Sequence, residues 1–286
     1  MATSTTTKKD DTVVGVARPE RRTPAARKLY SSNRTWLVPV FSVAVFLGIW
    51  QLIGSHVNPI LFATPYAVIQ SLVSLLKGGI LEPAWLRAME SLIIGLGLAT
   101  IVGTGVGVAM GRNDTISRAL NPYVNFFMAT PLVAMVPLVV IWVGIGLPAE
   151  ITVTFIIGVW SIIINTAEGI KSTPVPLLEM ARVYRISERS VIRNVAYPYA
   201  LPYVYAGMRI AIGKSLVGVI IAEMDISLKG LGGLVVLYGD AFNTSALLAI
   251  IICSAMVGVI CTILLDVLRR RTTPWDTHRT DRGRQS

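Results

Sequence analysis

The polar and apolar positions of the 286-residue chain are segregated into long blocks. Residues 35–57, 91–111 and 241–265 contain no Asp, Glu, Lys or Arg. Each is long enough to cross the hydrocarbon core of a bilayer as a helix, which takes about 20 apolar residues. Residues 119–149 are equally free of charge but too long for one span, and the Gly- and Pro-containing stretch 144–148 is a turn signal.

The pattern therefore predicts an all-α, polytopic membrane protein with six transmembrane helices. The predicted spans lie at 35–57, 91–111, 123–143, 150–167, 203–222 and 241–265. The segment between the first two spans is too polar to cross a membrane, and its apolar positions suit a short helix near the outer interface.

Two spans carry residues that indicate special packing. Small side chains recur at every fourth position of the second span: Gly95, Ala99, Gly103, Gly107 and Gly111. Such a stripe lets another helix approach closely, and it can also line a pore. The third span contains Pro131 and Pro137, which interrupt backbone hydrogen bonds, so we expect a kinked helix beside a translocation pathway or a kink needed for packing.

Composition and charge add class and orientation. Apolar residues make up 53% of the chain and charged residues 15%, against about a quarter in soluble domains, which excludes a disordered chain and argues against a soluble enzyme. Of 26 Lys and Arg residues, 21 fall on the side of the N-terminus and three on the other. By the positive-inside rule both termini are predicted to be cytoplasmic.

This orientation gives the predicted organisation of the chain. Residues 1–34 would form a mostly disordered cytoplasmic tail, residues 35–268 the transmembrane domain, and residues 269–286 a second cytoplasmic tail. The first segment has no apolar core of the kind that a signal peptide needs.

Most chemistries lack the necessary residues. Two His and two Cys far from other ligands predict no metal site, and no motif predicts a catalytic residue or a bound cofactor. The string GMRIAIGKS at 207–215 has one residue too many for a phosphate-binding loop and lies in a helical run. Aromatic and basic residues do not interleave as nucleic-acid binding requires.

The loop 168–202 is the informative polar segment. Pro174 and Pro176 can open one short helix, and Ser187 can cap a second. The resulting hairpin is apolar on one side and rich in Arg on the other, so we expect it to dock into a groove of a partner protein.

One string within this loop carries a resemblance to a known family. EMARVYRISERSVIRNVAYP, which starts at Glu179, resembles the signature loop of importer permeases of the ATP-binding-cassette (ABC) class. Glu179, Ala181 and Pro198 match the family pattern at the correct spacing. Arg185 stands at the usual Gly, and Tyr197 at the usual Leu.

Further strings extend the resemblance over about residues 36–270. They are FATPYAV, ATPLVAMVPLVVIWVGIG, INTAEGI, YPYALPYVYAGMRIAIG, and IAEM followed by GLGGLV. Together they are most similar to the sulfonate, taurine and nitrate branch of these permeases.

The resemblance implies an import machine of the type I ABC class in a bacterial inner membrane. Two permease subunits, expected to be a homodimer, would form the pathway. Two cytoplasmic ATPases would bind ATP and Mg and dock on the hairpin 174–196, and an extracytoplasmic binding protein would deliver the solute. The residues expected to contact the ATPase are Glu179, Ala181 and Tyr184, and Arg185 and Pro198 lie in the same loop. The alternative interpretation of Glu179 is a solvated acid that the helix dipole favours.

Two basic residues fall within the fifth span. A Lys at a helix centre costs about 2.5–3.5 kcal/mol on insertion scales, so Lys214 is expected to face a polar cavity or a partner. We expect Lys214, with Arg209, to help an anionic solute through the pathway; snorkelling, or pairing with Glu223, are the alternatives. Glu223 and Asp225 at the outer end would contact the binding protein or close an outer gate, or are simply solvated loop acids.

The sequence therefore predicts the permease subunit of an ABC importer for a small anionic solute, such as a sulfonate, taurine, nitrate or a carboxylate. The rival interpretation is an ion-coupled secondary transporter or a channel, which would leave the hairpin 168–202 without a purpose. The solute, and the choice between a homodimer and a heterodimer, stay open at this point.

Overall fold

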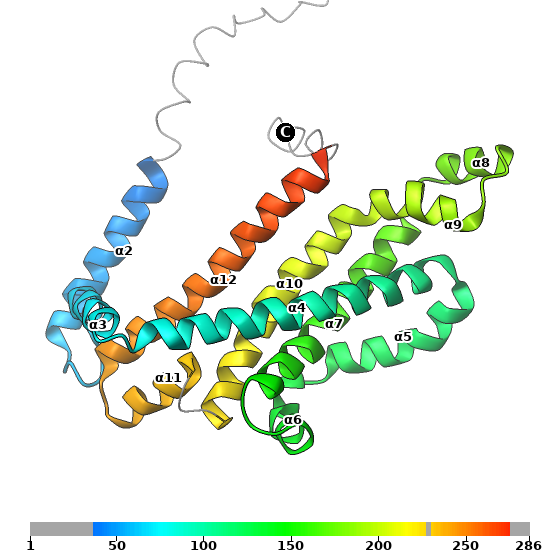
Figure 1. Ribbon diagram of the computed structural model, residues 1–286. Helices are drawn as coiled ribbons and strands as arrows, with labels where there is room; N and C mark the ends of the chain where they lie inside the picture. The colour runs from blue at the N-terminus through cyan, green and yellow to red at the C-terminus, as the bar shows by residue number, and fades with distance from the viewer. Residues whose placement is uncertain (1–36, 227–229, 275–286) are drawn as a thin grey trace, which may run out of the picture. The chain divides into compact units, whose positions relative to one another are not determined.

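The computed structural model describes residues 37–226 and 230–274, all of whose regular elements are helical (Figure 1). The chain divides into two compact units, residues 1–49 and 50–286, and α2 (Leu37–His56) begins in the first. The predicted tail 1–34 and the residues beyond 274 lie outside the described residues.

The second unit contains the remaining helices. They are α3 (Pro65–Lys77), α4 (Leu81–Arg112), α5 (Asp114–Ala129), the 3₁₀ turn η1 (Leu132–Met135), α6 (Val136–Val143), α7 (Leu147–Lys171), α8 (Val175–Val183), α9 (Glu188–Val191), the π-helical turn η2 (Ile192–Ala196), α10 (Tyr197–Ile226), α11 (Leu231–Asp240) and α12 (Thr244–Thr272).

Side chains of short polar residues fix several of these helix starts. Thr64, Asn113 and Asn243 precede α3, α5 and α12, and the side-chain oxygen of each accepts a hydrogen bond from a backbone N–H of the first turn. Such caps satisfy donors that a helix start leaves free.

The six predicted spans correspond to α2, α4, the α5–α6 pair, α7, α10 and α12. Five of these helices are long and apolar enough to cross a membrane by themselves, and the count is six if the bent pair is one span. The predicted boundaries are less accurate than the predicted spans. Helix α4 begins at Leu81, inside the segment expected to be an outer loop, and α12 continues to Thr272, inside the segment expected to be a tail.

The third span is broken, more sharply than the predicted kink. Its two halves meet at 91°. The break lies at Thr130, whose backbone is extended with ψ of 137°, and at Pro131, which follows it. Proline disfavours the helical conformation of the preceding residue and supplies no N–H. Pro137 instead lies in the first turn of α6, where proline is tolerated.

Helices α4 and α7 pack together along the stripe of small residues. A Cβ atom added to Gly95 would lie 2.5 Å from Thr154 Cβ, and one added to Gly107 would lie 2.5 Å from Thr166 Cβ. At Gly111 the same atom would lie 2.5 Å from Ile170. The interpretation of the stripe as a helix-packing surface is confirmed, because α7 approaches these glycines so closely that no larger side chain would fit.

Helix α7 is also held on its other side by α10. The Ser215 hydroxyl donates to the Thr154 carbonyl oxygen at 3.0 Å, and Gly207 lies against the backbone of α7 at Ser161. As a result α7 packs against both α4 and α10, and about half of its most apolar stretch is buried. This three-helix core positions the residues of the candidate site.

Candidate functional site

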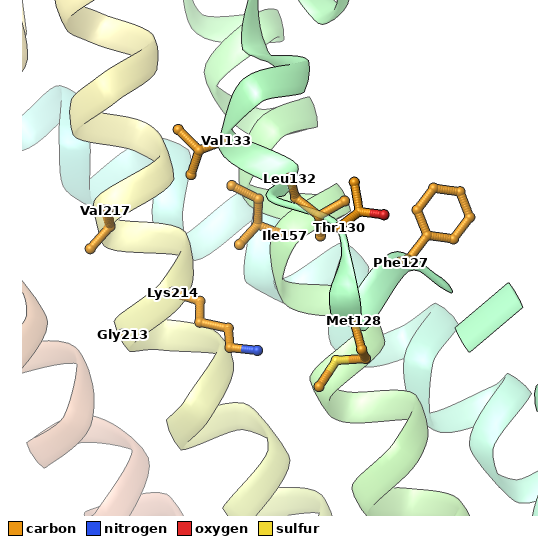
Figure 2. A pocket seen from close by; sticks show the side chains of 9 residues that line it. All are labelled: Phe127, Met128, Thr130, Leu132, Val133, Ile157, Gly213, Lys214 and Val217. Carbon is orange, nitrogen blue, oxygen red and sulfur yellow. The ribbon is translucent and has the colours of Figure 1, made fainter. Parts of the chain in front are cut away.

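A cavity of about 360 Å³ lies between the broken third span and α10 (Figure 2). Its lining residues come from α5, η1, α7 and α10. They are Phe127, Met128, Thr130, Leu132, Val133, Ile157, Gly213, Lys214 and Val217. The break creates one wall, because the segment that leaves the helix at Pro131 presents its neighbours Thr130 and Leu132 to the cavity.

Lys214 supplies the charge of this cavity. Its side chain extends from α10 toward Met128 (Figure 2). Within residues 37–226 and 230–274, no carboxylate lies within 4 Å of its amine. The alternative of a pair between Lys214 and Glu223 is therefore wrong, since Glu223 contacts the start of α11 instead.

The other pathway candidates lie elsewhere. Arg209 forms an ion pair with Asp266 of α12, and it is absent from the cavity lining. Pro131 and Pro137 are also absent from the lining. Pro131 acts on the cavity through the chain break, while Pro137 starts α6.

Glu223 is fully buried, so its interpretation as a solvated loop acid is wrong. Its Oε2 atom accepts a hydrogen bond from the Gly232 N–H at 2.8 Å. A Cβ atom at Gly230 would lie 2.2 Å from the Glu223 carboxyl carbon, so the glycines let the start of α11 close over this carboxylate. A direct contact of Glu223 with a binding protein does not fit this burial. Asp225 is exposed.

A second buried carboxylate was not among the predicted site residues. Glu150 is fully buried in the first turn of α7, and Arg87 of α4 donates to its Oε1 atom at 2.9 Å. The uncharged run begins only at residue 91, so the span predicted there leaves Arg87 outside the membrane helix. The signal was present, since Glu150 is the single charged residue between 119 and 167 and an intramembrane acid is expected to have a partner.

The predicted hairpin is present as α8, a tight turn, and α9. Arg185 has a positive φ of 52°, and its N–H donates to the Arg182 carbonyl oxygen at 2.9 Å. The Ile186 N–H donates to the Ala181 carbonyl oxygen at 3.0 Å. These two bonds form a Schellman motif, whose left-handed position is usually Gly. The turn is thus retained although Arg185 replaces the family's Gly.

Exposure divides the predicted contact residues of the hairpin. Glu179 is exposed, and Tyr184 and its neighbour Val183 are 74% and 80% exposed. Ala181 is only 3% exposed, so its side chain packs within the protein and offers little surface of its own to an ATPase. A small residue is needed there because the side chain faces the protein interior. Pro198 is half-buried at the start of α10.

An ion pair connects the hairpin to the helical core. Arg112, the last residue of α4, donates from Nε to Glu188 Oε1 at 2.8 Å. Glu188 is the first residue of α9, and α9 continues through η2 into α10. The hairpin is therefore connected to α4 through side chains and to α10 through the backbone.

Residues 99–274 match the family described as the binding-protein-dependent transport system inner membrane component. The chain belongs to this family. It is 32% identical over 240 residues to the bicarbonate transport system permease protein CmpB of Synechococcus elongatus, covering 80% of this chain and 85% of the relative. It is 30% identical to the nitrate import permease protein NrtB of Synechocystis, covering 87% and 91% of the two chains. It is 28% identical to the taurine transport system permease protein TauC of Escherichia coli, covering 87% and 96%.

A solved structure has the same fold. A chain of the MetNI methionine ABC transporter in an inward-facing conformation matches with a TM-score of 0.60 and 20% identity, covering 69% of this chain and 98% of that one. Family and fold together make this protein a membrane permease subunit of an ABC importer. Membership of the family excludes the rival interpretation as an ion-coupled transporter or channel, and the chain is a transport subunit.

Proposed function

We propose that this permease pairs with a second copy of itself to carry a small anionic solute into the cytoplasm. A binding protein delivers the solute from outside, and two cytoplasmic ATPases hydrolyse ATP with Mg. The single observation that carries the choice of an anion is Lys214, which faces a cavity with no acid among the described residues within 4 Å of its amine.

The position of Lys214 supports a role in the pathway. It lies about 26 Å along the axis from the start of α10 and about 18 Å from the helix end. A charge at this depth is costly, and such residues usually face a water-filled route or a partner. A fixed cation in the cavity offsets part of the cost of removing an anion from water. The names of the relatives, which refer to bicarbonate, nitrate and taurine, agree with an anionic or sulfonate solute.

Substitution of Lys214 tests this role. We expect Lys214→Met to lower uptake of the anionic solute by about tenfold or more, which corresponds to about 1.4 kcal/mol of lost stabilisation. Lys214→Arg should retain most of the uptake, because it keeps the charge. Lys77→Met, at an exposed Lys outside the cavity, is the control. Full uptake by Lys214→Met at equal membrane expression would refute the proposal.

The hairpin 174–196 is proposed as the element that couples ATP hydrolysis to transport. Val183 and Tyr184 give its tip an exposed apolar surface, which is the kind of patch that marks a protein interface. Closure of the paired ATPases would move this tip. The motion reaches α10, and with it Lys214, through the continuous backbone of α9, η2 and α10.

Binding of the ATPase tests the coupling role. We expect Tyr184→Ala and Glu179→Ala to reduce both the amount of ATPase that co-purifies and the uptake rate. Asn194→Ala is the matched control, because Asn194 is exposed on the same hairpin and its side chain donates a hydrogen bond to Ser190, one turn away. Equal recovery of the ATPase with all three variants would contradict this assignment.

At the outer end, we propose that Glu223 holds α11 in place and that this helix closes the outer mouth of the pathway. The buried bond from Gly232 to Glu223 supports a positioning role. Asp225 is exposed two residues further on, and we propose it as a contact for the binding protein. Both termini, with tails 1–34 and 269–286 around a transmembrane domain 35–268, are proposed to be cytoplasmic in a bacterial inner membrane.

A further inference from the structure

We propose that the cavity beside Lys214 favours organic anions that carry their charge at one end of an apolar body. It would discriminate against inorganic oxyanions, such as nitrate and bicarbonate, and against anions that also carry an amino group. This inference rests on the proposed role of Lys214 in anion transport. It goes beyond it because the relatives are named for different solutes, among them bicarbonate, nitrate, taurine and aliphatic sulfonates, and so do not choose between these classes.

The lining is strongly asymmetric in polarity. Lys214 supplies one ammonium and Thr130 one hydroxyl, and the remaining seven lining residues are apolar or glycine. Among the apolar residues, Phe127 stacks on Trp160 with ring centroids 4.3 Å apart and planes 13° apart. This stacking gives one wall a fixed aromatic surface.

The size of the cavity also suits an organic solute. Its volume of about 360 Å³ lies in the range of pockets that hold small organic ligands and have mostly apolar walls with a few placed polar groups. Nitrate or bicarbonate has four non-hydrogen atoms, and either would leave most of this space to water against apolar walls.

Hydrogen-bonding demand points in the same direction. An inorganic oxyanion presents acceptor atoms on every side, and each acceptor that leaves water without a new donor is destabilised. Among the nine lining side chains, only the Lys214 ammonium has donors left for a solute, because the Thr130 hydroxyl already donates to the Phe126 carbonyl oxygen at 2.7 Å. A sulfonate or carboxylate head places its oxygens at one end, where the Lys214 ammonium can bind them. Its apolar body then takes the place of water against Val133, Ile157 and Val217.

An amino group on the solute is disfavoured by charge. None of the nine lining residues is acidic, so a solute ammonium would have no counter-ion in the cavity. It would instead share a small space with the Lys214 ammonium, and like charges at short range repel. A zwitterionic aminosulfonate should therefore bind this cavity more weakly than an alkylsulfonate of similar size.

The test uses the complete complex of permease and ATPases in nanodiscs, without the binding protein, so that only the permease selects. The measurement is the shift in thermal unfolding temperature at constant ionic strength. The probes are alkylsulfonates from methanesulfonate to hexanesulfonate, and nitrate, bicarbonate and taurine. We expect a shift that grows with chain length, and little or no shift with the other three probes.

Three variants separate the two parts of the site. Lys214→Met should remove the alkylsulfonate shift, which also excludes a general detergent-like effect of the probe. Val217→Asn should flatten the dependence on chain length. Val259→Asn is its matched control, since Val259 is as exposed as Val217 (57% against 52%) but lies on α12, away from the cavity.

The outcomes distinguish this inference from the proposed function. If nitrate or taurine gives the same shift as hexanesulfonate, and Lys214→Met removes both shifts, the selectivity is refuted while the anion role of Lys214 stands. A shift independent of chain length refutes it in the same way. If no anion acts through Lys214, the proposed function fails and this inference fails with it.

Discussion

At the scale of single residues, two buried carboxylates specify how helices meet in this permease. Glu150 uses one oxygen to bind Arg87, and Glu223 uses one to bind the Gly232 N–H. The second oxygen of each has no hydrogen-bond partner among the described residues. Buried carboxylates persist only where they are paired, so these two contacts select one register between α4 and α7 and between α10 and α11.

Arg185 provides a residue-scale prediction. Its left-handed backbone costs a non-glycine residue about 1–2 kcal/mol, whereas Gly adopts it freely. We expect Arg185→Gly to stabilise the hairpin by about 1 kcal/mol and to slow hydrogen exchange of the Ile186 amide, which donates within the turn.

Arg185→Ala separates the backbone effect from the loss of the charge. It removes the guanidinium but keeps the strained backbone, so exchange at Ile186 should be no slower than in the wild type. If the Ala and Gly variants protect this amide equally, the side chain rather than the left-handed backbone limits the turn, and the prediction is wrong.

At the scale of helices, the glycines of α4 predict opposite effects of the same substitution. Gly107 faces α7, and a Cβ atom there would lie 2.5 Å from Thr166; around Gly105 there is no atom within 4 Å. We expect Gly107→Ala to destabilise the protein by about 1–3 kcal/mol, as overpacking does. Gly105→Ala should be neutral or stabilise it by up to about 1 kcal/mol, because Ala favours the helix.

Unfolding in a denaturing detergent measures the two variants in the same way. The Gly105 variant is the matched control, since it lies on the same helix, two residues away, with the same change in composition. Equal stabilities of the two variants would show that α4 and α7 can move apart slightly at no cost in free energy. The close packing of the two helices would then not require Gly at position 107.

Sequence patterns predicted the elements well where one local property decides them. Runs without charge located the spans, and Pro174 and Ser187 located the starts of the hairpin helices. Helix α11 was missed because it is short and its start depends on Glu223, a residue of another helix. The early start of α4 was missed because Glu90, a charged residue, ends the apolar run but not the helix.

The candidate site was predicted only in part, for a related reason. Lys214 could be identified because a charge within a span is conspicuous by itself. Thr130 and Leu132 could not, because they reach the cavity only through the 91° break between the two halves of the span. The pair of Arg87 and Glu150 joins residues 63 positions apart, and no local pattern reports such a contact.

At the scale of the whole molecule, coupling requires the hairpin and the cavity to belong to one mechanical unit. The connections favour this, because α9, η2 and α10 are continuous and Arg112 ties α4 to Glu188. Motion imposed on the hairpin tip would therefore be transmitted to both helices that flank α7. The hairpin can be moved by the ATPases only if it faces the cytoplasm, so the import mechanism requires the predicted orientation of the chain.

Labelling of introduced cysteines tests this orientation. Lys77, at the end of α3, is predicted to face outward, and Arg118, in α5, to face the cytoplasm; both are exposed in the structure. In spheroplasts, a membrane-impermeant maleimide should label Lys77→Cys directly, and Arg118→Cys only after the membrane is opened. The native Cys253 and Cys261 are buried, so the wild-type chain should give little background. The orientation rests on the bias of Lys and Arg between the two sides of the membrane, and labelling tests it directly. The reverse labelling pattern would place the hairpin outside the cell, where no cytoplasmic ATPase could bind it.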